Sequence, residues 1–331
     1  MQIRSTYFTK TFFLLALIAV AVGCKKEEYA LPTPKDALQN DVIKRTQGPN
    51  IAGQQIEFAY AMAIPEARGS LSRATVEASI EGAAGTFLEH RSFYTNPVGG
   101  ADVPVLVGDP STTDHGTTTV NFTVDTFAAT LRYFYVVPDE ARGKTVSFKF
   151  TVTSSNGETA TFNMGPYNVA NMTMKRLINV SDNNLMYISL EDMRAYNAAD
   201  AAANAAKIDL VYLYRTFPNS QFNHALVSPA AHADYLPGVT LPAGVNRDNM
   251  IRKVFNLQDF NLAQMQFGIY IDDLDFEKLD LTGSPNYAIN LKGEAGIWVE
   301  TADKKYRAYV YLNSANNTAK TAVISIKRYE L

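Results

Sequence analysis

The sequence predicts a mainly β protein with two folded domains. Segments of about four to eight residues in which apolar and polar side chains alternate recur along the chain, as strands with one buried face require. Turn residues, above all Gly, Pro, Asn and Asp, separate these segments. The chain has 331 residues, more than one compact core usually holds even after an N-terminal leader of 23 residues is removed.

An immunoglobulin-like β-sandwich is predicted for residues 51–171. The Asn156-Gly157 pair stands between two alternating runs, which is the strongest short-range signal for a β-hairpin. About seven short strands within about 120 residues are typical of this sandwich. The clearest of them are expected at residues 56–60, 74–80, 119–124, 129–136, 144–153 and 158–164.

A β-rich α+β domain is predicted for residues 172–331, as a sheet that carries one or two helices. An alanine-rich stretch at 191–207 has high helix propensity, and a second short helix is expected near 257–264. Strands are expected at 185–190, 208–215, 267–271, 287–291, 296–300, 306–311 and 321–329.

Residues 1–23 have the order of a secretory signal peptide. Arg4 and Lys10 give a positive start, and the apolar run that follows is too short to span a bilayer, which needs about 20 apolar residues. Ala21, Val22 and Gly23 then precede Cys24. This order resembles the lipobox of bacterial lipoproteins, which implies cleavage before Cys24 and lipidation of its thiol.

Cys24 is the only cysteine of the chain, so neither an intramolecular disulfide nor thiol catalysis by another cysteine is expected. Residues 24–50 are polar and interrupted by prolines, which predicts a lipidated, flexible tether. The charged cluster at 25–28 is similar to the signal that directs Bacteroidetes lipoproteins to the cell surface, although it could equally be an ordinary solvated linker. The expected location is the outer membrane, with the body facing the exterior.

The charge pattern argues against nucleic acid as a partner. The formal net charge is −3, and positive and negative residues are interspersed. No second apolar run is long enough for a transmembrane helix, so the lipid on Cys24 is expected to be the only attachment to a membrane.

Four phrases of the sequence resemble a family of uncharacterised Bacteroidales surface lipoproteins, and the likeness extends over nearly all of the mature chain. The resemblance implies an N-terminal immunoglobulin-like domain and a C-terminal domain of mixed structure, without an assigned activity. The phrases occupy residues 129–133, 208–215, 271–276 and 298–301.

Asp272, Asp273 and Asp275 form the most suggestive polar cluster, because alternating carboxylates suit a hard cation such as calcium. An EF-hand loop would require glycine at its sixth position, where Glu277 or Lys278 stands instead. The alternative is a solvated turn after a strand. Calcium is the only cofactor that these residues suggest.

His224 and His232 lie in a predicted proline-rich loop region and could meet in space to bind a ligand; the alternative is isolated polar surface. Tyr212 and Tyr214 alternate along one strand, and Trp298 lies in the terminal hairpin. Such aromatic residues either form a platform for sugar rings or pack in the core. The same alternation occurs in the pairs Tyr133 and Tyr135, and Tyr309 and Tyr311.

The function predicted from these features is a non-catalytic, lipid-anchored module that binds a glycan or a protein partner. The sequence contains no nucleophile elbow, phosphate-binding glycine loop or dinucleotide fingerprint. One alternative is a lipid-anchored glycan hydrolase with an unrecognised carboxylate pair, since a linear sequence cannot reveal such a pair. The other is a structural or adhesive envelope component.

Overall fold

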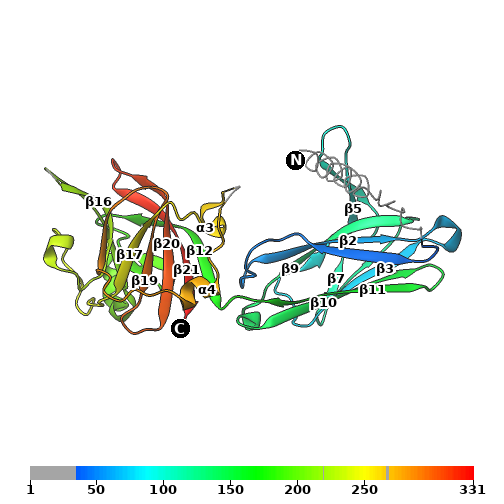
Figure 1. Ribbon diagram of the computed structural model, residues 1–331, viewed down its shortest axis with the longest axis horizontal. Coiled ribbons are helices and arrows are strands. Elements are labelled where there is room, and N and C mark those ends of the chain that lie inside the picture. The colour runs from blue at the N-terminus through cyan, green and yellow to red at the C-terminus, as the bar shows by residue number, and fades with distance from the viewer. Residues whose placement is uncertain (1–34, 219, 266–267) are drawn as a thin grey trace, which may run out of the picture. The chain divides into compact units, whose positions relative to one another are not determined.

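The computed structural model describes residues 35–218, 220–265 and 268–331 (Figure 1). It confirms the mainly β fold class, because strands dominate and all named strands pair antiparallel. The α-helices within the described residues have only four to six residues. Within the same residues, no helix combines the length and apolarity that crossing a bilayer demands.

The first domain is a sandwich of two sheets and one separate hairpin. The first sheet has the order β1 (Gln39–Lys44), β2 (Gln55–Ala63), β9 (Ala128–Val136) and β4 (Phe87–Leu88). The second has the order β11 (Thr159–Asn168), β10 (Thr145–Ser154), β3 (Leu71–Ala78), β8 (Thr117–Asn121) and β7 (Thr112–Asp114). The hairpin consists of β5 (Arg91–Thr95) and β6 (Asp102–Leu106), and two 3-10 turns lie at Glu66–Arg68 and Asp139–Ala141.

Alternation along the strands builds the core of this sandwich. In β2 and β9 every second side chain is buried, and the rings of Phe58, Tyr133, Phe148 and Phe150 meet between the sheets. The pairing of β1 with β2, β2 with β9, β3 with β10 and β10 with β11 is that of an immunoglobulin-type sandwich, with β7 and β8 added beyond β3.

Two features of the first domain differ from the sequence-based prediction. The predicted tether extends to residue 50, whereas β1 pairs with β2 and therefore belongs to the sheet. Exposed and less exposed positions alternate along its six residues, but Val42 is the only apolar residue among the less exposed ones, so the sequence shows no strand pattern. The hairpin of β5 and β6 was also not predicted.

The second domain contains two five-stranded sheets where one sheet was expected. The first sheet has the order β12 (Met172–Ser181), β21 (Thr321–Glu330), β20 (Tyr306–Asn316), β19 (Ala295–Glu300) and β17 (Met250–Phe255). The second has the order β14 (Arg194–Tyr196), β13 (Tyr187–Ser189), β15 (Leu210–Phe217), β16 (Ser220–Val227) and β18 (Tyr287–Leu291). The helices are α2 (Ala198–Ala203), α3 (Phe260–Ala263) and α4 (Asp273–Glu277), with 3-10 turns at Ala205–Lys207 and Ala233–Tyr235.

Central strands of this domain are buried on both faces. In β15, Leu210 and Tyr212 enter the core between the sheets, whereas Val211 and Leu213 enter a second core on the outer side. In β19, Ile297 likewise faces the inner core. Strands covered on both faces read as continuous apolar runs, which explains the unbroken apolar character of residues 210–214.

Two elements predicted for the second domain are not formed as expected. The alanine-rich stretch at 191–207 is divided into β14, α2 and a 3-10 turn, because residues 194–196 pair with β13. Residues 268–271 form no strand, and Ile269 makes only an isolated bridge with Asp259. The short helix expected near 257–264 is confirmed as α3.

Residues 257–265 and 268–281 cover the outer face of the β12–β17 sheet, and we call them the covering segment. The segment is fastened by a fully buried ion pair between Lys327 of β21 and Asp259, with Nζ and Oδ2 2.6 Å apart. The Lys327 ammonium also donates to Asn261 Oδ1 and to the carbonyl of Ile271, so all three of its protons have acceptors. Asp259 in turn accepts the backbone N–H groups of Leu262 and Ile271.

Replacement of Lys327 tests the role of this ion pair. Lys327→Met should lower the free energy of unfolding of the second domain by about 3 to 5 kcal/mol, because it leaves the Asp259 carboxylate buried without its cation. Urea unfolding followed by the fluorescence of Trp298, the only tryptophan, reports on this domain. Lys207→Met is the matched control, because Lys207 of the same domain pairs with Glu191 and Asp192 at a partly exposed site and should contribute less than about 1 kcal/mol. Equal losses in the two variants would contradict the assignment.

Candidate functional site

The predicted site residues fall into four groups. Cys24, the predicted lipidation site, lies outside the described residues. The tyrosines of β15 and the nearby histidines form the second group, the aspartates around α4 the third, and Trp298 with its neighbours the fourth. The structure brings the third and fourth groups together.

The paired tyrosines are core residues and offer no platform. Tyr212 is fully buried between the sheets, and Tyr214 is nearly so. Tyr133 and Tyr135 lie in the core of the first domain. Tyr309 and Tyr311 lie beneath the covering segment.

His224 and His232 do not form a common site. His224 lies in β16 rather than in a loop and is buried, with Nδ1 2.7 Å from the Tyr212 hydroxyl and Nε2 2.8 Å from Asn317 Oδ1. A neutral imidazole satisfies both bonds by accepting from Tyr212 and donating to Asn317. His232 is exposed and begins the short turn at Ala233–Tyr235, where its ring accepts from the Asp234 N–H group.

The three aspartates organise a helix start. Asp272 precedes α4 and accepts the N–H groups of Leu274 and Asp275, while the Asp275 carboxylate accepts the N–H group of Asp272. This is a reciprocal capping box. Asp273 accepts the N–H group of Asn171, and burial raises the pKa of its carboxyl. Within the described residues, no group of three or more His, Cys, Asp or Glu side chains is placed to hold a metal ion.

Trp298 and two of these aspartates line one hollow of about 520 Å³. The hollow lies between the edge of the β12–β17 sheet and the covering segment. Arg252 of β17 and Trp298 of β19 are direct cross-strand neighbours and form its sheet side. The full lining is Arg252, Tyr270, Asp272, Leu274, Asp275, Lys278, Leu279 and Trp298, and we call it the Trp298 hollow.

Trp298 is firmly positioned but lacks one hydrogen bond. Its ring packs edge-on against Phe276, with centroids 5.4 Å apart, and against Tyr309 at 4.8 Å. The side chain is only 7% exposed. Within the described residues no hydrogen bond uses its indole N–H group, and that nitrogen is not among the polar atoms that are sealed without a partner. A buried tryptophan normally pairs this group, so its donor is available to a ligand in the hollow.

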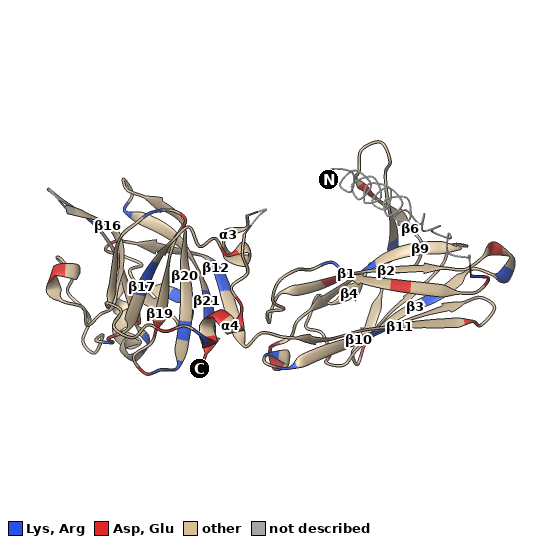
Figure 2. Cartoon of the chain, in the orientation of Figure 1, with Lys and Arg blue, Asp and Glu red and all other residues tan. Residues whose placement is uncertain are grey.

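Charges of both signs surround the rings of the Trp298 hollow. Arg252 and Lys278 are exposed cations, and Figure 2 shows the acidic residues of α4 and the basic residues of β17. One N–H group of the Arg252 guanidinium donates a hydrogen bond to the Asp280 carbonyl, at 2.9 Å. Tyr270 packs against Phe260 on one side and lines the hollow. The hollow therefore presents hydrogen-bond donors, acceptors and aromatic rings together.

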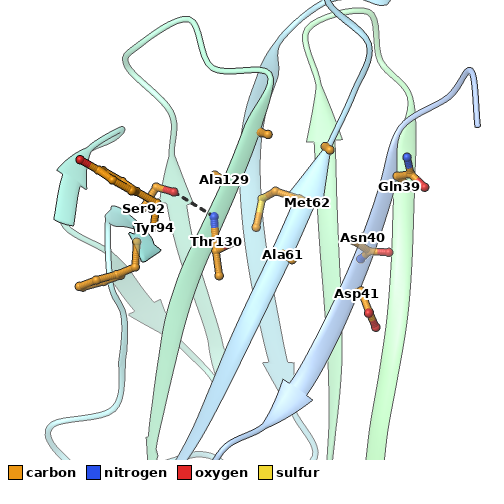
Figure 3. Close-up of a pocket in the computed structure, with 12 residues that line it drawn as sticks. Gln39, Asn40, Asp41, Ala61, Met62, Ser92, Tyr94, Ala129 and Thr130 are labelled. Carbon is orange, nitrogen blue, oxygen red and sulfur yellow. Dashed lines mark hydrogen bonds between the residues drawn. The ribbon is translucent and has the colours of Figure 1, made fainter. Parts of the chain in front are cut away.

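A second hollow, of about 480 Å³, lies on the outer face of the β1–β2–β9–β4 sheet. Figure 3 shows Gln39, Asn40 and Asp41 of β1 on one side and Ser92 and Tyr94 of β5 on the other, with β2 and β9 between them. Its floor carries small side chains. These are Ala61 and Ala63 of β2, and Ala128 and Thr130 of β9. We call it the sandwich groove.

Much of the polar lining of the sandwich groove is already bonded within the domain. The Asn40 amide donates toward the Tyr60 hydroxyl and toward the carbonyls of Phe150 and Ala160. The Ser92 hydroxyl accepts the N–H group of Thr130, at 3.0 Å. This groove consequently offers fewer free polar groups than the Trp298 hollow.

Sequence reasoning identified Trp298, Asp272 and Asp275 but missed their partners. Arg252, Tyr270 and Lys278 carry no motif, and they meet Trp298 only through strand pairing and the path of the covering segment. The sandwich groove was missed because its hairpin was not predicted. A run rich in valine and proline at 103–106 is its only local signal.

Family models match both domains. A domain of unknown function, DUF4466, matches residues 35–169, and another, DUF8576, matches residues 170–331. The chain is similar to a solved DUF4466 family protein from Parabacteroides merdae, with 47% identity and a TM-score of 0.84, over 90% of this chain and 100% of that one. No curated protein matches the sequence.

Two pilins are similar to this chain only weakly, in both sequence identity and TM-score. The major pilin subunit of Bacillus cereus has 8% identity and a TM-score of 0.29, over 87% of this chain and 62% of that one. A C-terminal fragment of the major pilin of Streptococcus agalactiae has 7% identity and a TM-score of 0.28, over 83% of this chain and 85% of that one.

The buried His224 predicts a pH dependence of stability. Burial lowers the pKa of its imidazole below the ordinary value of 6.5, although the bond to Asn317 opposes this shift. A depressed pKa means that the unfolded chain takes up the proton first. The free energy of unfolding should therefore fall as the pH decreases below 6.5, by at most about 1.4 kcal/mol per pH unit for one proton.

Urea titrations between pH 7.5 and 5.5 measure this slope. His224→Phe should lower the stability at every pH, because Tyr212 and Asn317 lose their partner, but it should also flatten the slope. Asp209, with a pKa raised to about 6 by burial, titrates with the opposite sign in both proteins and cancels in the comparison. An unchanged slope would show that His224 is not the titrating group.

Proposed function

This chain belongs to the DUF4466 family, and on that footing we propose that it is a lipid-anchored, non-catalytic glycan-binding protein of the bacterial envelope. The proposed anchor is the lipid on Cys24, and the proposed location is the outer membrane with the body facing the exterior. The proposed binding site is the Trp298 hollow. The proposed partner is a sugar chain rather than a nucleic acid.

The observation that carries this proposal is the unpaired indole N–H group of a buried tryptophan beside Tyr270. A sugar ring has an apolar face that packs against aromatic side chains and a rim of hydroxyl groups that both donate and accept hydrogen bonds. Trp298 and Arg252 supply donors, and Asp275 supplies an acceptor. Because the four charged side chains of the hollow balance, we infer that the sugar is neutral.

The bonding of the carboxylates favours binding over hydrolysis. A glycosidase requires one free carboxylic acid and one free carboxylate on opposite sides of the scissile bond. Asp272 and Asp275 both lie at the start of α4 and are engaged in its capping box. Neither is therefore free to act as the acid or the nucleophile without opening the helix.

The lone tryptophan makes direct detection of binding feasible. We expect at least one neutral gluco-, xylo-, manno- or galacto-oligosaccharide to change the fluorescence of the mature chain. Tyr270→Ala should weaken this binding by about 3- to 10-fold, because one stacking face is lost. Trp298→Phe, measured by calorimetry, should weaken it by about fivefold, because the ring is kept but the donor is lost.

Tyr94→Ala is the matched control, because Tyr94 is an exposed tyrosine of the other domain and should leave the affinity unchanged. If none of these oligosaccharides changes the Trp298 fluorescence or gives a heat of binding in calorimetry, the glycan proposal is wrong. Release of shorter sugars during the titration would favour the hydrolase alternative.

The anchor has its own test. Cys24→Ser should move the protein from the membrane fraction to the soluble fraction and abolish labelling by palmitate in cells, because the only acceptor thiol is removed. Sugar binding by the purified variant should remain intact. A variant that still sediments with membranes and still takes up label would contradict the lipoprotein assignment.

A further inference from the structure

The hairpin of β5 and β6 exposes an unusual amount of apolar surface. Its exposed large apolar residues are Tyr94, Val98, Val105 and Leu106, with 54%, 93%, 48% and 58% of their surface accessible. They account for four of the fifteen such residues in the described chain, although the hairpin with its turn spans only residues 91–106. Val105 and Leu106 lie at the base of the hairpin, opposite Ser92 and Arg91, whereas Val98 lies in the turn at its tip and is the most exposed of the four. Exposed apolar surface of this kind marks a contact site.

The hairpin stands away from the sandwich instead of packing into it (Figure 1). It forms a two-stranded sheet of its own and touches the β1–β2–β9–β4 sheet along β9. The Ser92–Thr130 hydrogen bond and the packing of Arg132 on the Phe93 ring, 4.5 Å from its centroid, hold β5 against β9, and an Arg132–Asp102 ion pair holds the hairpin next to its turn. The sandwich groove separates the remainder of β5 from β1 (Figure 3).

The projecting end of the hairpin is uncharged. Between residues 91 and 106 the only charged residues are Arg91 and Asp102, and the turn over 96–101 has none. Figure 2 draws this end in tan. A surface that enters the interface of a bilayer must lack charges at its tip, since each charge would have to be desolvated.

The hairpin also lies beside the point where the chain enters the first domain. Gln39, the first residue of β1, lines the same groove as Ser92 and Tyr94. Cys24 lies fifteen positions before Gln39, so even a fully extended chain places the lipid within about 50 Å of that point. A membrane that holds the lipid is thus within reach of the hairpin.

We propose that the tip of the β5–β6 hairpin is a second membrane contact, which inserts Val98 and its apolar neighbours into the interface of the bilayer that carries the lipid. On this proposal, the lipid on Cys24 is not the only attachment to the membrane. The contact rests on the proposed anchor at Cys24, but not on sugar binding.

A fluorescent label at the tip tests this contact in the full lipidated chain. Since lipid occupies the thiol of Cys24, Val98→Cys supplies the only free thiol, which can carry an environment-sensitive dye. The protein is reconstituted into phosphatidylcholine vesicles that contain nitroxide-labelled lipid. Quenching of the dye at position 98 should exceed quenching at position 177 by at least about twofold, since only inserted dye approaches the nitroxide.

Leu177→Cys is the reference site, because Leu177 is 55% exposed on the second domain. Ala101→Asp, which places a charge in the exposed turn, should reduce the quenching at position 98, whereas Leu177→Asp, which places the same charge on the second domain, should not. Equal quenching at positions 98 and 177 in vesicle-bound protein would overturn the hairpin contact and leave the anchor standing. Protein that fails to associate with vesicles at all would overturn both.

Discussion

The buried pair of Lys327 and Asp259 is the interaction on which the proposed site depends. The outer face of the β12–β17 sheet carries large aromatic side chains, and the covering segment packs over them. Lys327 rises from that face and binds three groups of the segment, while Asp259 caps α3 and holds Ile271. Two desolvated charges contribute little net stability compared with apolar packing, but they accept only one arrangement of their partners. The pair therefore fixes where α4 and Tyr270 lie relative to Trp298.

Further polar residues of the same sheet fasten the covering segment. The Tyr309 hydroxyl donates to the Leu257 carbonyl at 2.6 Å, and Asn313 donates to the Leu262 carbonyl at 2.8 Å. Arg307 reaches the carbonyls of Phe276 and Glu277 at the far end. Leu257 lies outside regular secondary structure, and the other carbonyls belong to the last turns of α3 and α4, where helical hydrogen bonds run out. Each bond therefore satisfies a backbone group that would otherwise lose its hydrogen bond to water. Side chains of one sheet thus replace the secondary structure that the segment lacks.

Local pattern predicted the fold class and the strands of the first domain, since alternation in strands such as β2 and β9 reports directly on a sheet with one wet face. It could not predict β1, whose pairing with β2 is visible only once both strands are in place. The same limit applies to the site. The alternation of side chains along strands correctly placed Trp298 with aromatic neighbours. The segment that covers them depends on Lys327, a single charged residue in an apolar strand, and no sequence motif marks that residue. Asp272 and Asp275 looked like cation ligands because a capping box uses the same residues at nearly the same spacing.

The Trp298 hollow has one wall on a sheet and the other on a segment held by a few polar bonds. Arg252 and Trp298 belong to paired strands, whereas Tyr270 and Lys278 belong to the covering segment. A ligand that touches both walls binds only when the segment is closed, so ligand binding and closure are linked equilibria. A substitution that loosens the segment lowers the fraction of molecules that are closed, and the apparent affinity falls in the same proportion. This holds even when the substituted residue does not contact the ligand. The strength of recognition at this site is consequently set in part by how tightly the protein holds its own chain.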